Sequence, residues 1–119
     1  MSTATKRAKR NRRAGHNYER ELAIRLREIF PLAATARNES RSRDAAGVDL
    51  VNTGPLNIQA KAWAAAPSYH TLLKDMPDEP GQHNTVFHKR PRQGTVVVMP
   101  ADDFLEMVAT LVKEGIWKS

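Results

Sequence analysis

The residues whose types could support chemistry gather around one short stretch of the chain, residues 46–63. Two β-rich runs in it, Gly47–Val51 and Leu56–Lys61, are separated by a turn that holds a Gly-Pro pair. Apolar, β-branched runs on either side of such a turn predict a β-hairpin. Because side chains alternate between the two faces of a strand, Gln59 and Lys61 are expected on the same face.

Three polar side chains of this hairpin are expected to lie close together. If the loop is Thr53–Pro55, Asp49 lies directly across from Gln59, which shares its face with Lys61. A carboxylate, an amide and an ammonium group then meet on one patch of sheet, and burying such groups is costly unless they have partners or a ligand. The alternative is the solvated polar face of an edge hairpin.

A fourth polar candidate, Glu19, lies in a helix predicted over roughly residues 17–30 and ended by Pro31. Glu19 falls in the first turn of this helix and on its apolar stripe. This position has two explanations: stabilisation of the helix N-terminus by a negative charge, or a carboxylate directed at the same site as Asp49. The apolar residues of the stripe recur at helical spacing and are Tyr18, Leu22, Ala23, Leu26, Ile29 and Phe30.

These four residues offer the parts of a hard-cation site with a charge stabiliser. Mg²⁺ prefers oxygen ligands and commonly takes only one or two protein carboxylates, which Glu19 and Asp49 would supply. Gln59 can add its amide oxygen but no negative charge. A bound metal lowers the pKa of its water and neutralises charge that develops on a phosphate. Lys61 would orient the attacking water or stabilise the transition state.

The rest of the chain predicts a mixed α/β protein in which helices pack on a central sheet. The order is helix, three strands, helix, two strands, helix. The last strand is continuously apolar, which is typical of a strand covered on both faces. The further elements are a weak strand at Ala33–Arg37, a short helix around Ser68–Lys74, strands at Asn84–Lys89 and Gly94–Met99, and a final helix that opens at Pro100 and stops at Gly115.

Composition narrows the class of protein. A chain of 119 residues with 40% apolar and 6% aromatic residues is expected to form one domain with a modest, mainly aliphatic core. The absence of cysteine excludes disulfides, thiolate metal sites and cysteine nucleophiles. No apolar run approaches the roughly 20 residues of a membrane span, and the N-terminus lacks the apolar core of a secretory signal. We therefore expect an intracellular, cytoplasmic protein with no membrane partner.

The formal net charge of +6 is concentrated at the N-terminus. The first 15 residues hold six basic and no acidic side chains, and the remainder holds 13 of each. Residues 1–14 lack periodicity and are expected to form a disordered basic arm ahead of a single domain over residues 15–119. Such an arm favours contact with the phosphates of a nucleic acid; nuclear localisation or simple solubility are the alternatives. Its candidate contacts are Lys6, Arg7, Lys9, Arg10, Arg12 and Arg13.

A second set of basic and hydroxyl side chains could also contact phosphates. The loop over residues 37–44 is rich in Arg and Ser, which present guanidinium forks and hydroxyls to a nucleic-acid backbone. An ordinary solvated loop is the alternative. His88, at a strand end, is expected to be a surface histidine. The candidate contacts in this set are Arg37, Ser40, Arg41, Arg43, Lys89 and Arg90.

The pattern resembles the PD-(D/E)XK nuclease superfamily, and most closely its Holliday-junction-resolvase-like branch in archaea and phages. The matching parts are residues 15–22, Gly47–Leu50 and Ile58–Lys61. In that family the first motif carries a helical Glu, the second a metal-binding Asp, and the third an acidic residue two positions before a Lys. The resemblance implies a restriction-endonuclease-like mixed β-sheet flanked by helices, in the order α-β-β-β-α-β-β-α. It makes Glu19, Asp49, Gln59 and Lys61 the candidate catalytic residues, with metal ligands among them at Glu19, Asp49 and Gln59.

The resemblance further implies a Mg²⁺-dependent endodeoxyribonuclease that cuts branched DNA or Holliday junctions, with Mn²⁺ able to substitute. It also implies a homodimer and is compatible with a location in a phage-infected host. Two residues depart from the family pattern: Val48 stands where Pro often precedes the Asp, and Gln59 replaces the acidic residue. Gln59 leaves open a non-catalytic nucleic-acid-binding module that keeps the nuclease fold. A third alternative is a small assembly protein whose arm binds another acidic partner.

Overall fold

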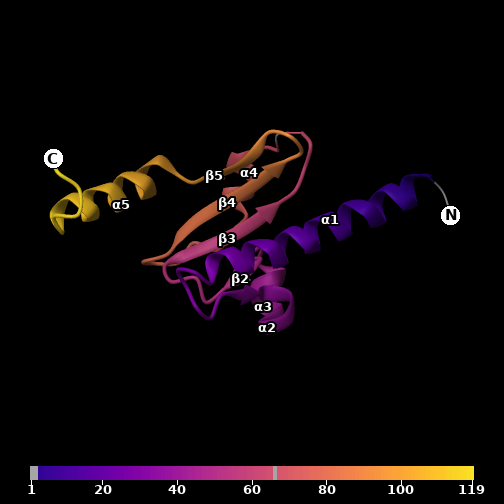
Figure 1. Ribbon diagram of the computed structural model, residues 1–119, viewed down its shortest axis with the longest axis horizontal. Helices are drawn as coiled ribbons and strands as arrows, with labels where there is room; N and C mark the ends of the chain where they lie inside the picture. Colours follow the sequence, from indigo (N-terminus) through magenta and orange to yellow (C-terminus); the bar gives the residue numbers. More distant parts are fainter. Residues whose placement is uncertain (1–2, 66) are drawn as a thin grey trace.

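In the computed structural model, a five-stranded mixed sheet lies between two helices that extend in opposite directions, and the molecule measures 57 × 28 × 26 Å (Figure 1). The structure describes residues 3–65 and 67–119. The predicted mixed α/β class with a central mixed sheet is confirmed, with two short helices added after the first strand. The elements are α1 (Thr3–Leu26), β1 (Ala34–Thr35), α2 (Ala36–Glu39), α3 (Arg41–Ala45), β2 (Leu50–Val51), β3 (Leu56–Lys61), α4 (Tyr69–Lys74), β4 (His83–Arg90), β5 (Gly94–Val98) and α5 (Ala101–Lys113).

The strands follow one another across the sheet in chain order, β1-β2-β3-β4-β5. Among the described strands, β3 and β4 form the one parallel pair, and α4 lies in the crossover that a parallel pair requires. The predicted hairpin is present as β2 and β3, with Leu50 opposite Ile58. Its turn includes Gly54 at a φ of 58°, where an added Cβ would lie 2.8 Å from the ring of Phe30. Glycine therefore allows both the turn and the close approach of Phe30.

Helix α1 packs against β1 and β3 through the predicted apolar stripe. Its buried residues contact Leu50 and Ile58 in one core cluster, and Phe30 packs partly buried beside it. Ile29 departs from the prediction and is 71% exposed, because regular helix ends at Leu26 and the chain turns away. The buried members of the stripe are Tyr18, Leu22, Ala23 and Leu26.

The basic segment at the N-terminus is helical rather than disordered, so that part of the sequence prediction is wrong from Thr3 onward; residues 1 and 2 lie outside the described residues. Ala, Lys and Arg are strong helix formers. The packed half of α1 supplies the costly nucleus, and extending an existing helix toward the N-terminus is much easier than starting one. The side chains from Thr3 to Ala14 are exposed. This part of α1 projects beyond the sheet (Figure 1).

The C-terminal elements are more exposed than their apolar sequences predicted. Strand β5 is the sheet edge, with Val96 and Val97 each about half exposed, so the expectation of cover on both faces is wrong. The β propensity of a Val run reflects backbone and side-chain shape and does not report an edge position. Helix α5 has no buried residue and extends away from the sheet, and Gly115 follows it at a φ of 75° (Figure 1). Among the described residues, none of the helices has the length and apolarity needed to cross a membrane.

Successive side chains of β4 point to opposite faces of the sheet. Phe87 packs against the α1 cluster, whereas His88 lies on the alternate face. The Nε2–H of His88 donates to the Trp63 carbonyl at 2.9 Å, and its Nδ1 is hydrogen-bonded to the Tyr69 hydroxyl of α4 at 2.8 Å. His88 is fully buried, so its prediction as a surface histidine is wrong. Its two bonds fix the segment that follows β3.

Candidate active site

Asp49 is held in place just before β2 by backbone contacts on both sides. Its N–H donates to the Ile58 carbonyl at 2.8 Å, and its carbonyl accepts from the Ala36 N–H at 2.7 Å. The side chain is fixed as well, because its Oδ2 accepts a hydrogen bond from the Ala60 N–H at 2.8 Å. Ala60 lies between Gln59 and Lys61 in sequence, so the carboxylate is positioned beside the polar residues of β3.

The carboxyl group of Asp49 is destabilised in its charged form. Burial, with smaller contributions from the negative charges of Glu19 and Asp44, raises its pKa from 3.8 to about 6. The hydrogen bond from Ala60 and the charge of Lys61 act in the opposite direction. The structure therefore brings Asp49 within electrostatic range of both Glu19 and Lys61, although these residues come from three separate parts of the chain.

Glu19 is buried on α1, with 8% of its surface exposed. The helix begins at Thr3, so Glu19 lies more than four turns from its N-terminus. Stabilisation by the helix dipole acts only in the first turn, which removes that explanation for the residue. The Oε2 atom of Glu19 accepts a hydrogen bond from Arg37 Nε at 3.3 Å, and the two side chains form an ion pair.

Gln59 is also buried, with 8% exposed. Its Oε1 atom is shielded from solvent and has no hydrogen-bond partner among the described residues. Its Nε2 atom lies 3.4 Å from the position that a Cβ on Gly47 would take, and Gly47 has a φ of 85°. The amide thus packs against the backbone two residues before Asp49, and its oxygen is left without a protein donor.

Lys61 lies at the end of β3 and is partly exposed. Its Nζ atom is 4.8 Å from the ring centroid of Trp63, which places the ammonium over the indole in a cation–π contact. Trp63 is 43% exposed and is therefore not a core residue. The contact keeps Lys61 near the sheet without burying its charge.

This donor set fits a divalent cation that prefers oxygen ligands. Glu19 and Asp49 offer two carboxylates that repel each other, and Gln59 offers a shielded amide oxygen with no donor. A cation among them would relieve the repulsion and satisfy the amide. The carboxylates and the amide oxygen are ligands of the kind that Mg²⁺ or Mn²⁺ takes.

Several predicted phosphate contacts have partners within the protein. Arg37 pairs with Glu19, a contact that sequence spacing did not indicate. Arg43 donates to Glu79 and to Asn57, both at 2.8 Å. The bond to Asn57 ties α3 to β3, and the bond to Glu79 ties α3 to the loop before β4. Together with Asn57, the guanidinium of Arg43 lowers the pKa of Glu79.

The other members of that set are closer to the surface. Ser40 caps α3 by accepting from the Arg43 N–H, and Arg41 beside it is exposed. Lys89 pairs with Glu21 at 3.1 Å on the surface, and the Nε of Arg90 donates to the Ala64 carbonyl at 2.9 Å.

No protein-family model, curated protein or solved structure matches this chain. Any assignment of function therefore depends on the residues and the geometry described above.

Proposed function

We propose that the protein is a metal-dependent DNA endonuclease that hydrolyses phosphodiester bonds in branched DNA or Holliday junctions. The observation that supports this proposal is the environment of Asp49, where burial and the nearby charge of Glu19 raise its pKa to about 6. A buried Glu19 carboxylate that raises the pKa of the partly buried Asp49, beside an amide oxygen without a donor, is costly unless a cation binds. The restriction-endonuclease-like identity of the sheet is part of the proposal.

In the proposed reaction, Glu19, Asp49 and Gln59 hold Mg²⁺, with Mn²⁺ able to substitute. The metal, when bound, supplies charge neutralisation at the phosphate and a more acidic water. Asp49 keeps its orientation through the Ala60 N–H, which costs no reorganisation when substrate arrives. Lys61, whose ammonium lies over the exposed ring of Trp63, would stabilise negative charge on the phosphate.

The N-terminal half of α1 is the proposed DNA-binding element. It is part of one continuous helix that projects beyond the sheet (Figure 1), and its six basic side chains are exposed. Arg12 precedes Glu19 by two turns and lies on the same side of the helix, so a phosphate backbone held by Arg12 leads toward the site. Counterion release on binding makes the affinity fall as salt rises.

The proposal includes a homodimer, because cutting a junction symmetrically requires two active sites. Exposed apolar side chains on β5 and α5, among them Val97 and Phe104, are available for such contact. We place the activity inside the cell, including the cytoplasm of a phage-infected host.

The test is cleavage of a supercoiled plasmid and of a synthetic four-way junction in the presence of Mg²⁺ or Mn²⁺. Asp49→Asn keeps the acceptor for the Ala60 N–H and removes the charge, so it should abolish cutting and leave DNA binding intact. The matched control is Asp78→Asn, at an exposed loop position. Equal cutting by wild type and Asp49→Asn would remove Asp49 from the mechanism.

A non-catalytic nucleic-acid-binding module is the second candidate, and two observations favour it. Gln59 adds no charge to the site, and Arg37 already balances Glu19 at 3.3 Å without a metal. Calorimetric titration with Mg²⁺ separates the two candidates. No saturable binding, together with intact DNA binding, would favour the module over the nuclease.

A further inference from the structure

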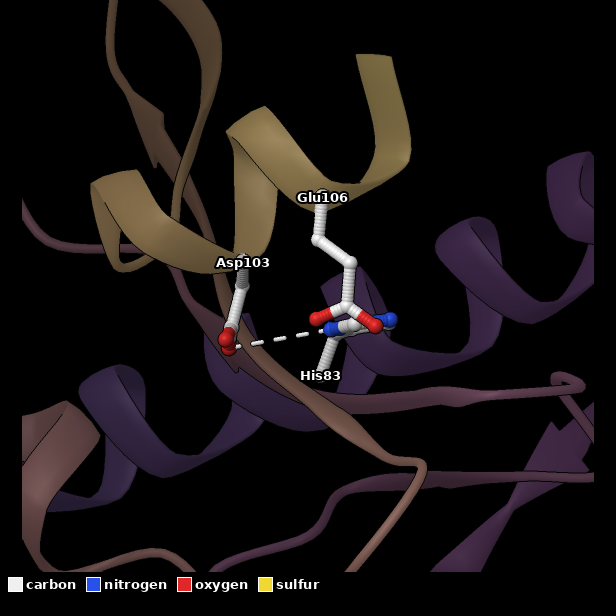
Figure 2. A group of neighbouring side chains, drawn as sticks. All are labelled: His83, Asp103 and Glu106. Carbon is white, nitrogen blue, oxygen red and sulfur yellow. Dashed lines mark ion pairs between the residues drawn. The ribbon is translucent and has the colours of Figure 1, made fainter. Parts of the chain in front are cut away.

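A second group of metal-capable side chains lies where α5 meets the sheet, away from Asp49. His83 begins β4, and Asp103 and Glu106 belong to the first two turns of α5. Figure 2 shows both carboxylates directed at the imidazole of His83, and one ligand atom from each residue lies within 4.8 Å of the other two. The two acids are three residues apart, which puts them on one side of the helix.

The imidazole of His83 has an unsatisfied nitrogen at the centre of this group. Its Nδ1 atom is shielded from solvent and forms no hydrogen bond within the described part of the chain. The nearest carboxylate oxygen, Asp103 Oδ2, is 3.7 Å away, beyond hydrogen-bond distance. Leaving a buried polar atom unpaired costs free energy, and a cation held between the nitrogen and the carboxylates would remove that cost.

We propose that His83, Asp103 and Glu106 form a separate binding site for a borderline divalent cation, with Zn²⁺ as the best match. Imidazole nitrogen favours Zn²⁺ and similar transition metals over Mg²⁺, which takes oxygen ligands. Zn²⁺ commonly takes three protein ligands together with water or another ligand in the fourth position. Glu106 is exposed, so the open position faces solvent.

The site would fasten α5 to the sheet. None of the residues of α5 is buried, so packing contributes little to holding the helix on the body of the protein. His83 is 20 residues before Asp103 and is anchored in β4 by its N–H, which donates to the Pro55 carbonyl at 2.7 Å. A cation that bridges strand and helix adds its binding free energy to the docked arrangement.

The donors of this site are distinct from those proposed for the nuclease, and the inference does not depend on that function. The experiment is carried out on the full-length Asp49→Asn variant, which lacks one carboxylate ligand of the site proposed around Asp49. Calorimetry with Zn²⁺ should give one strong site per chain, and Co²⁺ should give a visible absorption band typical of nitrogen and oxygen ligands. Hydrogen exchange of the α5 amides should slow by at least tenfold when Zn²⁺ is added.

Three further variants in that background test the ligands. Glu106→Gln is at an exposed position and should fold normally, and it should weaken Zn²⁺ binding by tenfold or more, as should His83→Ala. Asp102→Asn, an exposed neighbour outside the group, is the control and should bind as before. Unchanged affinity in both Glu106→Gln and His83→Ala, or unchanged exchange of α5 with Zn²⁺ bound, would overturn the proposal.

Discussion

The Oδ2 atom of Asp49 and the backbone N–H of Ala60 are joined by a hydrogen bond of 2.8 Å. This bond fixes a carboxylate from the segment before β2 against the middle of a neighbouring strand. Because Ala60 lies between Gln59 and Lys61, the bond sets the position of Asp49 relative to both. The position of the Asp49 carboxylate is therefore determined by the backbone of the hairpin.

Metal binding should depend on pH through Asp49. The carboxyl must lose its proton to coordinate a cation, and its pKa is about 6. Mn²⁺ affinity should therefore rise by up to about tenfold per pH unit below pH 6 and level off near pH 7. Calorimetry between pH 5 and 8 measures this. A flat profile across that range would show that Asp49 is not a ligand.

Replacing Asp49 with Asn should stabilise the protein at neutral pH. The folded pKa of about 6 lies above the ordinary value of 3.8, so between these values the folded state binds more protons than the unfolded state. The contribution of Asp49 to the free energy of unfolding therefore falls as pH rises from about 4 to 6. Above pH 6 the penalty is roughly 2 kcal/mol after allowance for partial exposure. Urea unfolding in chelator should show Asp49→Asn more stable by that order at pH 7.5 and equal to wild type at pH 4. A difference that does not change with pH would contradict this account.

Replacing Gln59 with Glu should strengthen metal binding and weaken the metal-free fold. The change puts a third carboxylate into a buried position where the amide oxygen has no donor. We expect a gain of at least tenfold in Mn²⁺ affinity, and a loss of roughly 1–3 kcal/mol of stability in chelator from the added buried charge. Gln93→Glu, in an exposed turn, is the control and should change neither quantity. Weaker Mn²⁺ binding by Gln59→Glu would place the metal elsewhere.

Two arginines of α1 provide a matched pair for DNA binding. Arg12 shares a side of the helix with Glu19, whereas Arg10 is nine residues from Glu19 and lies on the opposite side. Arg12→Ala should weaken binding to a four-way junction more than Arg10→Ala and lower the slope of log affinity against log salt by about 1. Fluorescence anisotropy across a salt series measures both. Equal effects would mean that α1 does not present one defined side to DNA.

The sequence was sufficient to predict the parts of the fold that depend on local pattern. Alternation along Leu56–Lys61 and the Gly-Pro turn predicted the hairpin and placed Asp49 beside Gln59, and the stripe around Leu22 predicted the packed half of α1. These features follow from the periods of helix and strand, which are independent of distant residues. The function assigned to the site stays a prediction.

Contacts between distant segments could not be predicted from the sequence alone. Nothing local pairs Arg37 with Glu19, or brings His83 to Asp103, since both depend on how the elements pack. The buried position of His88 was missed for the same reason. The exposure of Val97 shows the converse, because an apolar run does not reveal that its strand lies at the edge of the sheet.

The continuous helix from Thr3 to Leu26 has a geometric consequence. Lys6 and Glu19 belong to one rigid rod, and at 1.5 Å per residue they are about 20 Å apart along its axis. If the protein cuts DNA, the phosphate held at Lys6 and the phosphate that is broken are separated by a set span, close to six base pairs of duplex at about 3.4 Å each. The length of the helix would then determine how far from the bound phosphate the strand is broken.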